Sequence, residues 1–224
     1  AVRMDGAELA GLVRSYMRDN PGRRAQFEML VRALAANGQD AALQVLLSVA
    51  RRHRMAGVQA TATALAQEVA DERGWSAQEL ADRTVPTAGF GSDGVLRLSY
   101  GEREFIGRLG PDLRIVVSDA SGRPVRSLPA PRVDEDPEMV KEARRALRVA
   151  RKEAKAVLGL QSARLYEAMC ASRTWSGADW RGLLAGHPLV GRLVTRLVWT
   201  ATSGEGLVTF RPAGDGALLG VDDV

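Results

Sequence analysis

The segments GWSAQEL, at residues 74–80, and TWSGADW, at residues 174–180, share one pattern. In each, a serine is followed three positions later by an acidic residue, and a tryptophan precedes the serine. This combination is a capping box, in its aspartate variant in the second copy, together with a hydrophobic staple. The pattern predicts helices that begin directly after Ser76 and Ser176. These two helix starts lie on either side of a central segment with a different texture.

Residues 7–83, which contain the first of these starts, have the apolar spacing of short helices joined by short polar turns. Such helices must pack antiparallel to their neighbours, and stacked helical hairpins of the HEAT or armadillo kind have this pattern. We therefore expect residues 1–84 to form a helical-repeat-like segment. The clearest apolar stripe, at positions i, i+3, i+4, i+7 and i+8, consists of Phe27, Leu30, Val31, Leu34 and Ala35.

The central segment starts at Val85-Pro86, where helical spacing gives way to alternation of apolar and polar residues. Short alternating stretches are separated by turn sequences such as Gly110-Pro111-Asp112 and Ser121-Gly122. This arrangement predicts an antiparallel β-meander over residues 95–128. One face of it is apolar, so we expect helices to cover that face.

The remainder of the chain is predicted to be helical first and then a hairpin. Acidic residues before Pro137 favour the start of a long helix, and shorter helices follow as far as Trp199. Two apolar stretches around Ala213-Gly214-Asp215-Gly216 predict a hairpin. The sequence therefore predicts an α+β protein, with a second domain at residues 85–224 that holds helices within 137–200 and a hairpin at 205–222.

The composition of the 224 residues, 46% hydrophobic and 26% charged, is that of a globular protein without a membrane-spanning stretch. A net charge of +4 suggests nucleic acid as a partner, but only three of the 31 basic residues are lysines, an arginine bias that a GC-rich genome also imposes. The single cysteine, Cys170, favours a cytoplasmic location. Both ends of the sequence look cut, so we expect a piece of a longer protein.

Several sequence motifs occur in the same order as in a known bacterial family. They include residues 80–90, the predicted meander, the proline-rich connector at Pro129-Ala130-Pro131, residues 165–169 and Arg196-Leu197-Val198-Trp199. Over roughly residues 40–224 the chain resembles the domain of unknown function 4132, the family that includes proteins named molybdate metabolism regulator, MolR. The resemblance implies a large multidomain bacterial protein with helical-repeat segments. It implies no established activity and no catalytic residues.

The best candidate for a binding site is a basic stripe on the long helix. Its members recur at spacings of three and four, which places them on one helix face. Such a stripe could follow the phosphates of a nucleic acid. Because no aromatic residues are interleaved for base stacking, a solvated helix face, or one that pairs with acids elsewhere in the parent protein, is the preferred interpretation. The stripe consists of Lys141, Arg145, Arg148, Lys152 and Lys155.

Other chemically active residues have structural interpretations. Neither His53 nor His187 has a cysteine or an acid at metal-ligand spacing, so no metal site is predicted. Cys170 has no base nearby in the sequence and is expected to be a buried thiol. No glycine-rich loop has the spacing of a phosphate-binding motif, and no cofactor is predicted.

These observations predict a non-catalytic interaction or scaffolding module of a larger bacterial protein, with a regulatory role as one option. The expected partner is another protein or the remainder of the parent chain, and no membrane is expected. The alternative is binding of nucleic acid through the basic helix at residues 141–155. A third class, an enzyme, would require a polar pocket near Tyr100, Arg103 or Cys170.

Overall fold

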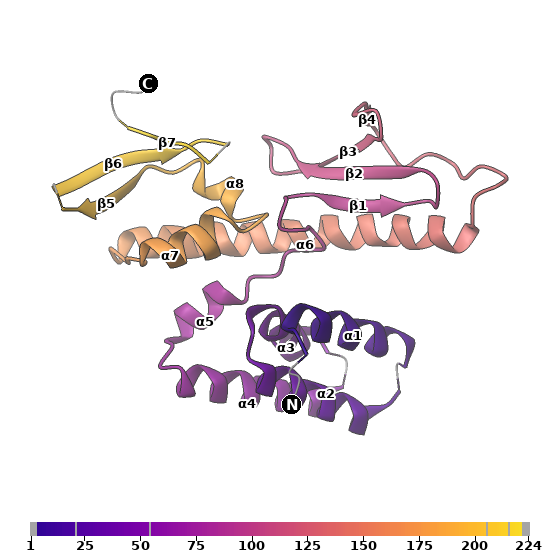
Figure 1. The fold of residues 1–224 in the computed structure, drawn as a ribbon, viewed down its shortest axis with the longest axis horizontal. Coiled ribbons are helices and arrows are strands. Elements are labelled where there is room, and N and C mark those ends of the chain that lie inside the picture. Colours follow the sequence, from indigo (N-terminus) through magenta and orange to yellow (C-terminus); the bar gives the residue numbers. More distant parts are fainter. Residues whose placement is uncertain (1–3, 21, 54, 205, 215, 221–224) are drawn as a thin grey trace. The chain divides into compact units, whose positions relative to one another are not determined.

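The computed structural model describes residues 4–20, 22–53, 55–204, 206–214 and 216–220. The chain divides into two compact units, Ala1–Pro86 and Thr87–Val224. Helices make up the first unit, whereas the second combines helices with two antiparallel sheets (Figure 1). The predicted α+β class is confirmed.

The first unit contains two stacked helical hairpins followed by a short helix. Helix α1 packs on α2 and α3, and α4 packs on α2 and α3, so the second hairpin covers the first. The predicted apolar stripe on α2 is largely buried, because Phe27, Val31, Leu34 and Ala35 belong to the core of this unit. The helices are α1 (Gly6–Asp19), α2 (Arg24–Asn37), α3 (Asp40–Arg52), α4 (Ala56–Glu72) and α5 (Ala77–Arg83).

Both predicted helix starts are confirmed. The Ser76 hydroxyl accepts a hydrogen bond from the Glu79 backbone N–H at 3.2 Å, and the Glu79 carboxylate accepts one from the Ser76 backbone N–H at 2.8 Å. The Ser176 hydroxyl likewise accepts from the Asp179 backbone N–H at 3.0 Å. The preceding tryptophan, Trp75, packs against the core of the first unit. These residues therefore have a structural role, as their pattern indicated.

The first sheet is the predicted meander, with strands in the order β1-β2-β3-β4. Its register places Leu98 opposite Phe105, and both side chains are buried. Val117 on β3 is also buried, because alternate residues of a strand point to the same face of the sheet. The strands are β1 (Leu96–Ser99), β2 (Glu104–Leu109), β3 (Ile115–Asp119) and β4 (Pro124–Val125).

The long helix α6 (Pro137–Cys170) lies along the first sheet and contacts β1 (Figure 1). It begins where the sequence predicts, because the Asp136 carboxylate accepts a hydrogen bond from the Glu138 backbone N–H at 2.9 Å. The helix is unbroken through Gly159. Its buried residues are Val140, Ala143, Leu147, Ala150, Ala154, Val157, Leu158, Gln161 and Ala168.

The last part of the chain differs from the prediction. Helix α7 (Gly177–Asp179) continues into a π-helical turn, η1 (Trp180–Ala185), and α8 (Gly191–Val194) is followed by a strand. The prediction of helices as far as residue 200 is therefore wrong at its end, because Trp199 begins a strand. The predicted hairpin at 205–222 is confirmed, because β6 (Gly206–Pro212) and β7 (Leu218–Leu219) pair antiparallel on either side of the predicted turn. The unpredicted strand β5 (Trp199–Ser203) pairs with the other edge of β6, so the hairpin is part of a three-stranded sheet.

Aromatic packing explains why residue 199 begins a strand. The Trp199 ring lies edge-on to Trp180 at 5.5 Å and to Trp175 at 6.0 Å, and its Nε1 donates to the Val194 carbonyl at 3.1 Å. Phe210, the register partner of Trp199 on β6, also meets Trp180, at 5.6 Å. This cluster joins the second sheet to η1, and pairing with β6 overrides the helical spacing of the residues before Trp199.

Candidate functional site

The basic stripe lies on the exposed side of α6. All five of its residues, Lys141, Arg145, Arg148, Lys152 and Lys155, are exposed. Each stripe residue lies one or two positions after a buried residue of α6. Because each position rotates about 100° around the helix axis, the stripe faces away from the buried row. The structure therefore brings all five predicted residues onto one accessible surface.

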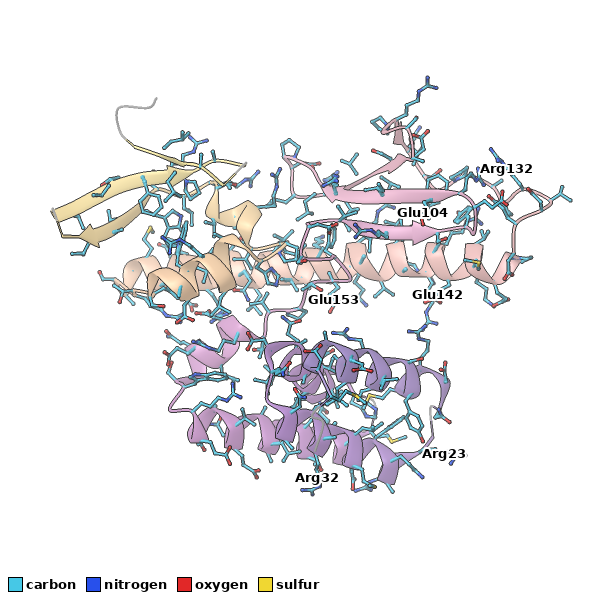
Figure 2. All side chains as sticks on the ribbon, viewed as in Figure 1. Arg23, Arg32, Glu104, Arg132, Glu142 and Glu153 are labelled. Atoms are coloured by element: carbon cyan, nitrogen blue, oxygen red, sulfur yellow. The ribbon has the colours of Figure 1, made fainter. Side chains whose placement is uncertain are left out.

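Acidic residues of the same helix neutralise only the first part of the stripe. Lys141 Nζ lies 3.1 Å from a Glu138 carboxylate oxygen, and Arg145 Nη1 lies 3.8 Å from Glu142. Both pairs are exposed, so they contribute little to stability. Within the part of the chain that the structure describes, Arg148, Lys152 and Lys155 have no ion-pair partner. Figure 2 shows Glu142 and Glu153 projecting from the side of α6 that is turned away from β1.

Arg144, which flanks the stripe, has a different role because its side chain turns toward the sheet. Its Nε donates to the Tyr100 hydroxyl at 3.2 Å, and its Nη2 donates to the Pro129 carbonyl at 2.9 Å. The Tyr100 hydroxyl in turn donates to the same carbonyl at 3.2 Å. These bonds join the connector before α6 to the first sheet, and they hold the helix that carries the stripe.

Arg103 completes this attachment through an ion pair with Glu135. Its Nε and Nη2 donate to the two Glu135 carboxylate oxygens at 2.6 and 2.8 Å, and Nη2 also donates to the Ala130 carbonyl at 3.2 Å. The guanidinium carbon lies 5.4 Å from the centre of the Tyr100 ring. Tyr100 and Arg103, which an enzyme site would need as polar pocket residues, instead hold the connector in place.

This ion pair makes stability depend on pH in a defined direction. The hydrogen bonds from Arg103 hold the pKa of the Glu135 carboxyl below its ordinary value, and the backbone N–H of Arg132 acts in the same direction. A lowered pKa in the folded state adds stability above the unfolded pKa of about 4.3. That stability is lost as the pH falls through the lowered folded value.

We therefore expect Arg103→Gln to lower the thermal midpoint at pH 7, and the difference from wild type to shrink as the pH falls below the unfolded pKa of about 4.3. Differential scanning calorimetry of both proteins across this range of pH measures the difference. Arg108→Gln is the matched control, because Arg108 is exposed on β2 and forms no ion pair with any residue that the structure describes. If the difference in thermal midpoint between Arg103→Gln and wild type stayed constant with pH, the stabilising role of the Arg103–Glu135 ion pair would be contradicted.

A ring nitrogen of each histidine bonds to nearby backbone, and the cysteine is exposed. His187 is buried, and its Nδ1 accepts from the Leu189 and Val190 backbone N–H groups, both at 3.2 Å. His53 Nδ1 accepts from the Met55 backbone N–H at 3.2 Å. Cys170 is exposed, so the expectation of a buried thiol is wrong; it lies at the end of α6, where the helix leaves the packed surface.

Neither a metal-binding cluster nor a membrane-spanning helix is found among the described residues. They contain no group of three or more His, Cys, Asp or Glu side chains that could hold a metal ion. No helix in the described ranges combines the length and the apolar character needed to cross a bilayer.

The sequence interpretation missed a hollow in the second unit. Its volume is about 410 Å³, and it lies between the β2–β3 turn, the α8 segment and the β6–β7 turn. Three arginines contribute to its wall, and their spacing along the chain carries no recognisable motif. The hollow is lined by Gly110, Pro111, Leu113, Arg192, Thr195, Arg196, Arg211, Pro212, Ala213, Gly214 and Leu219.

Comparisons with known proteins support the resemblance over part of the chain. A family model described as a domain of unknown function, DUF4132, matches residues 122–224. The chain is also 31% identical over 206 residues to the uncharacterized protein YehI of Escherichia coli strain K12. That alignment covers 90% of this chain but only 17% of YehI, so the chain spans a small part of the relative's length. No solved structure matches the chain significantly.

Proposed function

We propose that this chain is a non-catalytic interaction module of a longer protein, and that its second sheet docks on another part of that protein. The observation that carries the proposal is the exposure of neighbouring apolar residues on β6, where Leu207 is 72% and Val208 is 47% exposed. Because successive strand residues point to opposite faces, both faces of the sheet present apolar surface at this end.

Two further apolar residues are exposed on the edge strand, which pairs with the other end of β6. Leu218 and Leu219 on β7 are 49% and 36% exposed. Exposed apolar side chains gathered on one sheet indicate a site of protein interaction, and fully burying each such side chain contributes about 1.5–3 kcal/mol. YehI, of which the alignment covers 17%, supports an occupant from the same polypeptide.

Hydrogen exchange tests this docking. We expect amides of β5 and β6 to exchange at least about tenfold more slowly in the longer parent protein than in this segment alone. Leu207→Ser combined with Val208→Ser in the parent protein should restore the fast exchange. Val116→Ser is the control, because Val116 is 43% exposed on β3, a strand of the first sheet. Equal exchange in the segment and the parent protein would contradict docking.

Nucleic acid is the second candidate partner, and the geometry of α6 favours it. Arg148, Lys152 and Lys155 are exposed on one face and have no ion-pair partner among the described residues. The phosphates of a nucleic acid attract such a row of cations. Binding releases counterions from the nucleic acid, so the affinity falls as the salt concentration rises. Five phosphate contacts predict a slope of log affinity against log salt of about −4.5 for duplex DNA.

Fluorescence anisotropy with labelled duplex and single-stranded oligonucleotides, over a range of salt concentrations, tests this second function. Replacing the five stripe residues, Lys141, Arg145, Arg148, Lys152 and Lys155, with glutamine should abolish binding and its salt dependence. The control variant carries Arg108→Gln and Arg181→Gln, which remove exposed charges elsewhere in the same unit. No binding by the wild type at low salt would exclude nucleic acid as the partner of this face.

A further inference from the structure

The hollow beside α8 collects positive charge from two separate parts of the chain. Arg192 and Arg196 are four positions apart, so they lie on the same side of the α8 segment, and Arg211 enters from β6. The Arg196 guanidinium donates to the Pro111 carbonyl, which ties this segment to the β2–β3 turn. Among the residues that the structure describes, none forms an ion pair with Arg192 or Arg211, and no described lining residue is acidic.

Three arginines line one hollow, and an anion bound there would offset their positive charge. Guanidinium is the side-chain group best suited to phosphate, because its planar fork donates two parallel hydrogen bonds to two oxygens. The charge and the donor geometry therefore both select an anion with several oxygens.

Apolar side chains form another part of the wall. Pro111 and Leu113 come from the β2–β3 turn, and Pro212 and Leu219 come from the second sheet. A volume of about 410 Å³ lies within the range of small-molecule sites. The hollow thus offers space for an anionic group and for the rest of the ligand that bears it.

Leu113 adds a second feature of functional sites. Its φ of 62° lies in the left-handed region, which a bulky side chain disfavours and glycine adopts freely. Its side chain nevertheless forms part of the wall of the hollow. Such local strain is found preferentially at ligand sites.

From this geometry we propose that the hollow binds the phosphoryl group of a small soluble ligand, with Arg192 and Arg211 as the principal donors. Arg196 positions the β2–β3 turn through its bond to Pro111. This inference shares no residue with the basic stripe on α6. It shares Leu219 with the proposed docking surface, but its test replaces only arginines, so the two proposals can fail separately.

Isothermal titration calorimetry with pyrophosphate tests the site. We expect saturable binding with one site per chain, and a loss of affinity of about tenfold or more in Arg192→Gln and in Arg211→Gln. Arg108→Gln removes the same charge outside the hollow and should leave the affinity within about twofold. Arg211→Lys keeps the charge but not the planar fork, so it should also weaken binding.

Further measurements distinguish the sources of the phosphoryl group and the outcomes that overturn the proposal. ATP should compete with pyrophosphate, whereas binding only to phosphatidylcholine vesicles that contain phosphatidate would identify a lipid headgroup and overturn a soluble ligand. The absence of pyrophosphate binding at low salt would overturn the proposal.

An equal loss of affinity in Arg108→Gln would overturn it too, since the effect would then reflect net charge. Near-UV circular dichroism verifies that each variant is folded, and a misfolded glutamine variant leaves Arg211→Lys as the decisive comparison.

Discussion

Phe27→Ala is expected to lower the free energy of unfolding of the first unit by about 3–5 kcal/mol. The Phe27 side chain is 1% exposed, and its ring meets Tyr16 edge-on at 6.3 Å and His53 at 5.3 Å. Truncation to alanine removes these contacts and leaves a cavity between helices that cannot fully collapse. A loss of this size is a large fraction of the about 5–15 kcal/mol that stabilises a typical domain.

Hydrogen exchange by mass spectrometry at stepped urea concentrations reads peptides of the two units separately. We expect Phe27→Ala to lower the urea midpoint of peptides within 6–72 and to leave peptides within 96–170 unchanged. Met29→Ala, on the same helix, is the control, because Met29 is 71% exposed and should change stability by less than about 0.5 kcal/mol. An equal fall of both sets of peptides would contradict separate unfolding of the units.

Local patterns in the sequence predicted the features whose cause is local. The caps at Ser76 and Ser176 depend on a partner three residues away, so their motif was sufficient. The basic stripe could also be placed on one face of α6, because helical spacing alone decides it. The first sheet followed from the alternation of residues and from turns at close spacing.

Features that depend on distant contacts could not be predicted in this way. Trp199 follows a helical apolar pattern, but its ring contacts with Trp175 and Trp180 and its pairing with Phe210 place it in a strand. The arginine hollow depends on contacts between residues far apart, such as the bond between Arg196 and Pro111 across 85 positions. No spacing along the chain marks such a site.

Leu147→Ala is the second large change that we expect, with a loss of about 2–5 kcal/mol in the free energy of unfolding of the second unit. The Leu147 side chain is 5% exposed on the buried row of α6, the helix that contacts β1. Neighbouring buried positions on the helix are the small residues Ala143, Ala150 and Ala154. Leu147 therefore supplies much of the apolar volume at the centre of this contact, and alanine there leaves a gap that its small neighbours cannot fill.

Val149→Ala separates this packing effect from the helical propensity of α6. Val149 lies two positions further along the same helix and is 50% exposed, so its truncation should change stability by less than about 0.5 kcal/mol. Urea-dependent hydrogen exchange should show a lower midpoint for peptides within 96–170 in Leu147→Ala alone. Equal effects of the two variants would mean that α6 is stabilised by its own backbone rather than by the sheet. In that case the basic stripe would be displayed by the helix without any help from β1.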